Sequence, residues 1–545
     1  MNQDSISEMA GLFIQLKQSA NKRGVTLRPA VCELFGPRLQ FHRPLLGILA
    51  WFSVSFVALA ASGAKEKPEF QRAQMVAKNI CGVCHLFPQP ELLDRYTWTN
   101  HIKPLMHTSM GVAGLENNPS PDARALMEQW NAIWDDYYLV AAPEKAPPQD
   151  PRPPIVPDLG LFKVEDPKYE VTNGYATMIQ IDNQTHQIYV GNAIKKSLDV
   201  LDSRGRLLAS SPVDTTLTHL LQGPEGWLGT QIGIVPPNDL PLGLITLYDR
   251  KENRFEKHCD LLSGLLRPVH VAAADLLGDG HQELVVSSFG NRFGRLAWYS
   301  QTGPCRYTEH TIADRPGAVA SRILDVDHDG KPDLVVLMAQ AKEGVFLYRN
   351  QGGGEFVEKA LIEQPPVWGY AYFELADFNG DGHLDILTAN GDRGDFECPP
   401  RKYHGIRIYL NDGQWNFKES FFYPLNGAYK CMAVDFDGDG DLDIAAISFF
   451  PDYDKSPEES FVYLESQGGL KFTAHTFPDC SRGRWLTMDA SDLDGDGDVD
   501  IVLGGVYKTP FRAPQALYER WQKEGPSVLI LRNQVAERKQ QAAPK

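Results

Sequence analysis

Two cysteines and a histidine stand close together in the segment ICGVCHLF, residues 80–87. Cys81 and Cys84 are separated by two residues, and His85 follows directly. Two thiols at this spacing can form thioethers to the two vinyl groups of one porphyrin, and the next residue can offer its imidazole to the iron. A thioredoxin-like pair would open a helix after a strand, and zinc would need a second Cys or His pair nearby; neither pattern is present. The motif therefore predicts one covalent c-type haem.

The second axial ligand of such an iron is expected in the segment HIKPLMHTSMG, residues 101–111. This segment offers four candidate side chains, namely His101, Met106, His107 and Met110. Met106 is the first choice, Met110 is the alternative, and a histidine comes third. A methionine opposite the histidine would raise the reduction potential relative to a pair of histidines.

Short acidic runs recur further along the chain and begin at Asp275, Asp325, Asp377, Asp435 and Asp492. The pattern D-x-[DN]-x-D-G-x-x-D places side-chain oxygens at positions 1, 3, 5 and 9 of a tight loop, with a backbone carbonyl at position 7. Hard oxygen ligands from one short loop favour Ca²⁺. An EF-hand is excluded because a strand-like stretch, and not a helix, follows each run.

Four of the runs are complete, and they predict about four calcium ions. Their expected ligands are Asp325, Asp327, Asp329 and Asp333; Asp377, Asn379, Asp381 and Asp385; Asp435, Asp437, Asp439 and Asp443; and Asp492, Asp494, Asp496 and Asp500. The remaining run offers Asp275, Asp279 and Glu283 but has Leu277 at position 3, so a fifth ion is expected to bind weakly or not at all. Simple Asp-Gly turns would not explain four such loops, because unscreened carboxylates this close together repel one another.

The elements that must position these loops follow from their spacing. Successive runs are 50, 52, 58 and 57 residues apart, and each is followed by a β-rich stretch such as LVVLMAQ or IAAISFF. A period near 50 in a strand-rich chain indicates a propeller or a β-solenoid. Residues 155–535 have room for seven blades of about 54 residues, two of them before the first acidic run. The sequence thus predicts a mainly β fold, with a seven-bladed β-propeller over 158–535 and a disordered tail over 536–545.

Basic and aromatic residues precede the acidic runs, at positions where the inner strands of a propeller would approach one mouth of its channel. They are Arg267, His270, Arg322, Tyr370, Tyr372, Lys430, Arg484 and Trp485. Such a set suits an anionic or sugar-like ligand. The favoured interpretation is nevertheless that most of these side chains pack the channel.

Two helical patterns flank the Cys-x-x-Cys-His motif. PEFQRAQMVAKNI leads into it, and SPDARALMEQWNAIWDDYY starts with Ser120 as N-cap and Pro121 at the first helical position. An apolar stripe at helical spacing follows, made of Leu126, Trp130, Ile133, Trp134 and Tyr137. We expect a small all-α cytochrome c-like domain over 65–142 and a proline-rich, extended linker over 143–157.

The first 64 residues have the pattern of a leader followed by an apolar segment. Residues 44–64 carry no charge and end in small residues, as in a signal peptide or a membrane anchor. Basic residues upstream would keep residues 1–43 in the cytoplasm and send the rest of the chain across the membrane. The expected location is the periplasm or the extracytoplasmic face. The net charge of −17 argues against nucleic acid as a partner.

Disulfides are allowed in that location. Cys259 and Cys305 lie in neighbouring repeats and could pair, as could Cys398 and Cys431. The sequence does not determine the connectivity, and one of the five cysteines after the linker must stay unpaired.

These residues carry a resemblance to known families. The repeats resemble FG-GAP/VCBS repeats, the blades of integrin-α-type propellers. Residues 66–535 as a whole resemble bacterial proteins in which a small c-type cytochrome domain precedes such a propeller. The resemblance rests on CGVCHLFPQPELLDRYTWTNHIKPLMHTSMG, RPVHVAAADLLGDG, RKYHGIRIYLNDG and GRWLTMDASDLDGDGDVDIVLGG. It implies haem binding, calcium-stabilised blades and an extracytoplasmic site, but no agreed substrate; the chain departs from the pattern at Leu277 and in its first two blades.

The combined hypothesis is an exported one-haem cytochrome whose propeller docks a partner. Electrons would pass one at a time through the haem, and the propeller would bind a redox partner protein or a small-molecule or carbohydrate ligand. One alternative is an oxidoreductase in which the propeller oxidises a substrate and the haem accepts the electrons. Another is a cell-surface adhesion module. No nucleophile–base pair or glycine-rich phosphate loop is recognisable, so no catalytic residue is predicted.

Overall fold

The computed structural model describes residues 67–118, 120–170, 174–396, 398–507 and 513–542. The predicted leader and the apolar segment at 44–64 lie outside these residues. Within the described ranges, no helix is both long enough and apolar enough to cross a membrane.

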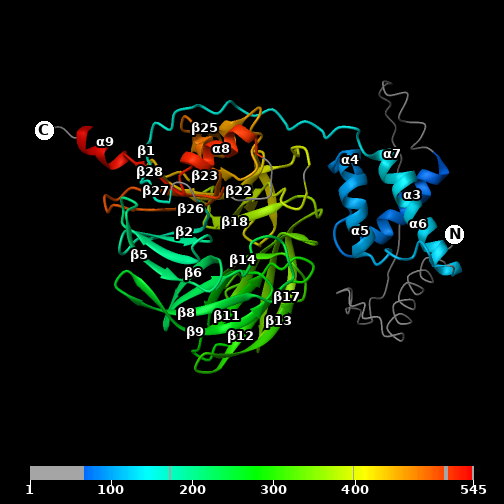
Figure 1. Ribbon diagram of the computed structural model, residues 1–545, viewed down its shortest axis with the longest axis horizontal. Coiled ribbons are helices and arrows are strands. Elements are labelled where there is room, and N and C mark those ends of the chain that lie inside the picture. Colours follow the sequence, from blue (N-terminus) through cyan, green and yellow to red (C-terminus); the bar gives the residue numbers. More distant parts are fainter. Residues whose placement is uncertain (1–66, 119, 171–173, 397, 508–512, 543–545) are drawn as a thin grey trace.

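Seven four-stranded antiparallel sheets form a ring, as the sequence predicts (Figure 1). The first two, which lack the acidic pattern, contain β2 (Ala176–Asp182), β3 (Gln187–Asn192), β4 (Ser197–Leu201), β5 (Leu207–Pro212), β6 (Leu217–Gly223), β7 (Gly226–Gln231), β8 (Gly243–Lys251) and β9 (Arg254–Leu265). The next four contain β10 (Pro268–Ala274), β11 (Glu283–Ser288), β12 (Arg295–Gly303), β13 (Arg306–Ala313), β14 (Ala318–Leu324), β15 (Asp333–Met338), β16 (Glu343–Gly352), β17 (Glu355–Gln364), β18 (Tyr370–Ala376), β19 (Asp385–Asn390), β20 (Gly405–Asn411), β21 (Phe417–Pro424), β22 (Ala428–Val434), β23 (Asp443–Ser448), β24 (Phe461–Ser466) and β25 (Phe472–His475).

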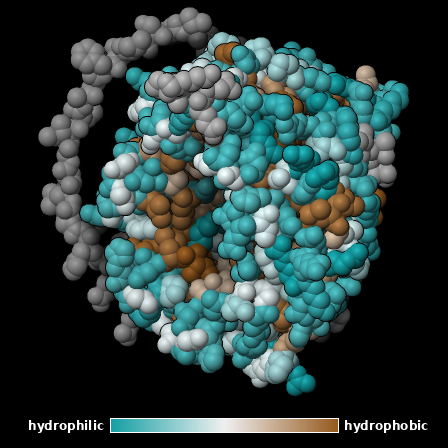
Figure 2. Space-filling view, turned by 90° about the vertical axis from the view of Figure 1, so that its left-hand side faces the viewer, coloured by the Kyte–Doolittle hydropathy of each residue, from teal (hydrophilic) through white to brown (hydrophobic). Residues whose placement is uncertain are grey.

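The seventh blade closes the ring with strands from both ends of the propeller. Its inner strands are β26 (Trp485–Ser491), β27 (Asp500–Gly505) and β28 (Val528–Asn533), and its outer strand is β1 (Phe162–Glu165). β1 pairs antiparallel with β28, with Phe162 opposite Asn533. The sequence did not predict this closure, because β1 is short and carries no acidic run. Figure 2 shows this side of the molecule as largely hydrophilic, with an apolar strip along a hollow.

The second strand of each acidic blade is buried along its whole length, which explains its continuous apolar sequence. β15 reads DLVVLM and β23 reads DIAAIS, and all of their residues are buried. Such strands lie between the inner strand and the third strand of their own sheet and pack on the sheets of neighbouring blades. The core is therefore distributed around the ring between adjacent sheets.

A helical unit precedes the propeller. It comprises α3 (Pro68–Cys81), the 3₁₀ turn η1 (Pro90–Leu92), α4 (Arg95–Thr97), the π-helical turn η2 (Trp98–Ile102), α5 (Lys103–Ser109), α6 (Pro121–Ala132), the π-helical stretch η3 (Ile133–Tyr138) and α7 (Leu139–Ala141). Both predicted helices are confirmed, and the Ser120 side chain accepts a hydrogen bond from Ala123 N, as expected for an N-cap. Trp98, Trp134 and Tyr138 are buried at the centre of the unit, where they pack against α3.

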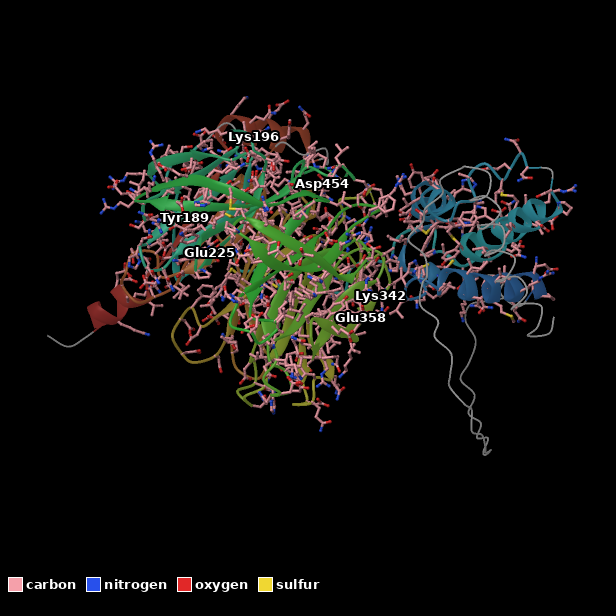
Figure 3. The ribbon with its side chains drawn as sticks, turned by 90° about the horizontal axis from the view of Figure 1, so that it is seen from below. Tyr189, Lys196, Glu225, Lys342, Glu358 and Asp454 are labelled. Carbon is pink, nitrogen blue, oxygen red and sulfur yellow. A yellow bond between two sulfur atoms is a disulfide. The ribbon has the colours of Figure 1, made fainter. Side chains whose placement is uncertain are left out.

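The helical unit is docked against the blade formed by β18–β21 (Figure 1). The His101 ring stacks on Phe396, with ring centroids 5.1 Å apart. The Tyr403 hydroxyl donates to Leu92 O at 3.4 Å and its ring stacks on Trp368. In the neighbouring blade, Lys342 and Glu358 form a 2.8 Å ion pair on the side that faces the helical unit (Figure 3).

The proline-rich linker is extended, as predicted, and it is held against the propeller. Gln149 donates to His404 O at 3.1 Å, and Arg152 lies 2.7 Å from the buried Glu459 carboxylate. Val156 then forms a bridge with His475 at the outer edge of its blade. The linker therefore leads the chain across the ring to β1 along a defined path (Figure 1).

Two expectations differ from the structure. Residues 536–542, expected in a disordered tail, belong to helix α9 (Val535–Ala542), whose first turn is capped by the Asn533 side chain. The other C-terminal elements are η4 (Pro457–Ser460), η5 (Cys480–Arg482) and α8 (Gln515–Glu524).

Cys259 and Cys305 form a disulfide, whereas Cys398 and Cys431 do not pair. Cys398 contacts the Arg401 guanidinium, and Cys431 is buried on the inner strand β22.

Candidate functional site

The Cys-x-x-Cys-His motif sits at the end of the first helix. Cys81 is the last residue of α3, and Cys84 and His85 lie in the turn that follows. Gly82 fits the helix end because an added Cβ would lie 2.6 Å from Lys78 O. Cys81 lies against Tyr138, and burial raises the pKa of its thiol to about 11. The Cys84 side chain is exposed.

The His85 ring is oriented for metal ligation. Its Nδ1 lies 2.9 Å from Leu86 O, and because a carbonyl only accepts, Nδ1 must be the protonated nitrogen. The lone pair of Nε2 therefore remains available to a metal, which is the usual arrangement for a ligating histidine. Burial also lowers the pKa of His85, against the opposing effect of the Glu363 carboxylate in β17, and favours the neutral ring.

The four candidates for a second axial ligand fall into two groups. His101 is stacked on Phe396 at the propeller, and His107 is paired with the Glu116 carboxylate at 2.8 Å. Met106 and Met110 are half-buried and pack against the aromatic core of the helical unit. Because both histidines have other contacts, Met106 and Met110 remain as the candidates for the second axial ligand.

The surroundings of the motif fit a large apolar group with polar edges. Val83 and Leu86 are 62% and 42% exposed, although both are apolar and flank the motif cysteine and histidine. Trp134 Nε1 is buried in the core of the unit without a hydrogen-bond partner. A porphyrin would cover apolar side chains such as Val83 and Leu86, and its propionates could accept from a buried indole. The donor set and its surroundings therefore fit a c-type haem.

The acidic loops share one hydrogen-bonding frame. The aspartate at position 1 accepts bonds from backbone N–H groups of its own loop; Asp435, for example, accepts from Gly438, Asp439 and Gly440. The aspartate at position 9 opens the second strand and accepts from position 2 and from the end of the third strand. In the seventh blade Asp500 accepts from Leu493 N and Asn533 N. This frame fixes the backbone of each loop around its first and ninth residues.

Three of the four complete loops bring carboxylates close enough to share an ion. The converging groups, whose ligand atoms lie within 4.8 Å of one another, are Asp325, Asp327 and Asp333; Asp435, Asp437 and Asp443; and Asp492, Asp494 and Asp496. In the described residues, the run at Asp377 and the run at Asp275 do not converge in this way.

Basic side chains distinguish the three converging loops. Arg349 forms an ion pair with Asp327, and Arg532 Nη1 lies 3.2 Å from Asp494 and 2.7 Å from Asp500. At the corresponding place the Asp435 loop has Glu465, which is paired with His475 at 3.0 Å. Burial raises the pKa of Asp437, and the charge of Glu465 adds to that shift. The Asp435 loop therefore has no arginine at this place, although Lys539 of α9 lies beside its Gly438.

Burial and neighbouring carboxylates raise the pKa of the ninth residue in these loops. The pKa of Asp443 rises to about 6 and that of Asp500 to about 7, mainly because of burial, with the charges of Asp437 and Asp494 adding to the shift. Carboxylates that repel one another in this way gain from a bound divalent cation.

Four of the predicted mouth residues meet near the axis of the ring. His270 and Lys430 are the third residues of their inner strands, as is Tyr372, and Arg322 is the fifth of its own strand. Residues two apart on a strand point to the same side, here toward the axis. Three further residues that meet near the axis were not predicted from the sequence, namely His219, Glu374 and Asp489. We call these seven residues the axial cluster.

The axial cluster is charged and largely self-neutralising. Lys430 Nζ donates to Met488 O at 2.6 Å and lies 5.1 Å from the centre of the Tyr372 ring. Burial lowers the pKa of Lys430, while the carboxylates of Asp489 and Glu374 oppose that shift. Burial likewise lowers the pKa of His219 to about 3, with Arg322 and Lys430 adding to it. Two cations and two carboxylates thus balance across the ring.

The other predicted mouth residues lie outside the axial cluster. Trp485 is fully buried between sheets because a bulge between Trp485 and Thr487 turns this first residue of its inner strand into the core, and a bulge between Tyr370 and Tyr372 does the same for Tyr370. Arg267 donates to Gly290 O and Val235 O, and Arg484 lies 4.1 Å from the centre of the Phe449 ring. Trp485, one of the candidates for a ligand mouth, lies in the core instead, and its indole N–H donates to Cys480 O.

The chain contains FG-GAP-like repeats, which match residues 275–336, 325–388 and 435–503. A segment of 193 residues is 28% identical to Cartilage acidic protein 1 of Mus musculus, covering 32% of this chain and 28% of that protein. The human Cartilage acidic protein 1 is 28% identical over 194 residues, covering 32% and 27%. The chain thus spans just over a quarter of the length of these relatives.

Solved structures match this chain at low sequence identity. A streptogramin B lyase has a TM-score of 0.43 at 11% identity, covering 69% of this chain and 98% of its own. The N-terminal part of BBS1 in complex with ARL6 has a TM-score of 0.40 at 11% identity, covering 69% and 97%.

Proposed function

We propose that the protein is an exported one-haem electron-transfer protein, with the haem held by the helical unit and a calcium-stabilised FG-GAP propeller that docks its partner. The observation that carries the proposal is the oriented His85 ring next to Cys81 and Cys84 at the end of α3. A haem bound there would supply one-electron oxidation and reduction.

The residues of the helical unit have distinct tasks in this proposal. Cys81 and Cys84 would hold the group covalently, and His85 Nε2 and Met106, or alternatively Met110, would bind its iron. The buried aromatic side chains that pack against α3 would help to exclude water from the group. Because the unit is docked on the propeller through Phe396 and Tyr403, its distance from a partner bound at the propeller would stay fixed.

The propeller serves as a docking platform in this proposal and not as the centre of catalysis. The axial cluster balances its own charges, which supports a structural role for the predicted mouth residues. The partner would be a redox protein, with a small molecule or carbohydrate as the alternative. The disulfide between Cys259 and Cys305 supports a location outside the cytoplasm, in the periplasm or at the outer face of the membrane.

Replacing both motif cysteines tests the proposal. We expect the purified full-length protein to show a Soret band that shifts on reduction with dithionite. Cys81→Ser combined with Cys84→Ser should abolish that band after denaturation, because the thioethers cannot form. Cys480→Ser, which changes a buried cysteine of the propeller, is the matched control and should leave the band in place. A wild-type protein without haem would refute electron transfer as the function.

A further inference from the structure

The acidic loop of the seventh blade differs from the loop at Asp325, which also holds an arginine, because here the arginine is buried and contacts two of the expected ligands. The Arg532 guanidinium lies between position 3 and position 9, 3.2 Å from Asp494 and 2.7 Å from Asp500. It is largely buried and also donates to Ser203 O at 2.7 Å, which holds it in place. Two of the four expected calcium ligands in this loop therefore already have a cationic partner.

A second group of carboxylates lies directly beside this arginine-filled loop. Asp496, Asp498 and Glu537 place their oxygens within 4.8 Å of one another. Asp498 is at position 7, where the loop pattern requires only a backbone carbonyl, and Glu537 comes from helix α9. The helix is held here because Ala536 N donates to Asp498 Oδ2 at 2.9 Å.

Two oxygens of this group are buried without a hydrogen-bond donor. Asp498 is 8% exposed, and its Oδ1 has no hydrogen-bond partner. Glu537 Oε2 is buried and equally without one. Within the described ranges, no lysine or arginine forms an ion pair with either side chain. Buried carboxylate oxygens that face only other carboxylates are strongly unfavourable unless a cation or a proton lies between them.

We propose that Asp496, Asp498 and Glu537 bind a divalent cation of the calcium type, which fastens helix α9 to the seventh blade. Three carboxylates with no nitrogen or sulfur donor favour a hard ion such as Ca²⁺. This site shares Asp496 with the loop at Asp492 but extends beyond the four loop sites, since Glu537 and the side chain of Asp498 belong to none of them. It also goes beyond the proposed electron transfer and does not depend on haem.

The location gives the ion a structural task at the ring closure. α9 follows β28 directly, and β28 pairs with β1, the strand that completes the ring. Arg538 of the same helix donates to Gly160 O, on the segment that enters β1. Figure 1 shows α9 beside β1, β27 and β28, where the two ends of the propeller meet. The ion would therefore hold together the one blade whose sheet is assembled from both ends of the propeller.

Calcium titration of the chelator-treated full-length protein tests the site. We expect Glu537→Gln and Asp498→Asn each to bind one calcium ion fewer than the wild type by isothermal titration calorimetry. In hydrogen exchange, calcium should slow the α9 amides of the wild type by about tenfold or more, and should not slow those of Glu537→Gln. Glu519→Gln, on the exposed surface of α8, is the matched control.

Two results would overturn the site. Equal calcium stoichiometry in the wild type and in both variants would show that no ion binds to Glu537 and Asp498. Exchange in α9 that depends on pH but not on calcium would show that a shared proton holds the carboxylates. Because the readout is a difference of one ion, it stays informative even if the other loops bind no calcium or the protein holds no haem.

Discussion

We expect calcium removal to lower the melting temperature of the full-length protein at pH 8 by more than about 5 °C. A single site held at 100 times its dissociation constant contributes about 2.7 kcal/mol to the stability of the folded state. The three converging loops would each contribute. Thermal unfolding with EGTA and with excess Ca²⁺ measures the difference.

The effect of calcium removal should depend on pH. The pKa of Asp443 is raised to about 6 and that of Asp500 to about 7 in the fold, against about 4 in an unfolded chain. The fold therefore binds these protons more tightly, and the stability that they contribute is lost as the pH rises through 6 and 7. We expect the calcium-free protein to melt at a lower temperature at pH 8 than at pH 5, and saturating calcium to reduce that difference.

Single replacements distinguish the loops. Asp437→Asn should remove more of the calcium-dependent stabilisation than Asp377→Asn, since the loop at Asp377 does not converge. If EGTA left the melting temperature at pH 8 unchanged, the acidic loops would be turns without a structural ion.

We expect Lys430→Met to destabilise the propeller by about 1–3 kcal/mol, because it removes a cation that faces two half-buried carboxylates. Glu374 and Asp489 are the groups concerned, and burial raises the pKa of both. Adding Asp489→Asn should recover part of the loss, since the remaining charge of Glu374 can still be balanced by Arg322. Equilibrium unfolding in urea gives the free energies.

An exposed lysine provides the control for this replacement. Lys418→Met, on the outer strand β21, should change the unfolding free energy by less than about 0.5 kcal/mol. A Lys430→Met protein as stable as this control would contradict the structural role of the axial cluster. With that outcome, Lys430 would again be a candidate for ligand binding.

The repeat spacing was sufficient to predict the propeller but not its closure. Acidic loops about 50 residues apart imply the number of blades, because each loop joins the first two strands of one sheet. β1 has no such marker, and its pairing with β28 is a contact between distant parts of the chain. Similarly, the disordered tail was expected from polar composition, whereas α9 forms because Asn533 and Asp498 bind its first N–H groups.

The candidate site was predictable where local spacing determines geometry. Cys81, Cys84 and His85 lie on one turn, so their proximity follows from the sequence. The axial cluster depends on the alternation of side chains along inner strands. A bulge between Trp485 and Thr487 shifts the register by one residue, which explains why Trp485 points into the core while Asp489 points to the axis. Glu537 could not be found, since its contact with Asp498 depends on where the C-terminal helix packs.

The most direct test of the proposed function is intact-protein mass spectrometry of the purified exported protein after acid and organic extraction. A covalent haem predicts a mass that exceeds that of the polypeptide by one haem and remains after extraction. A polypeptide mass without this addition would contradict a covalent haem at Cys81 and Cys84.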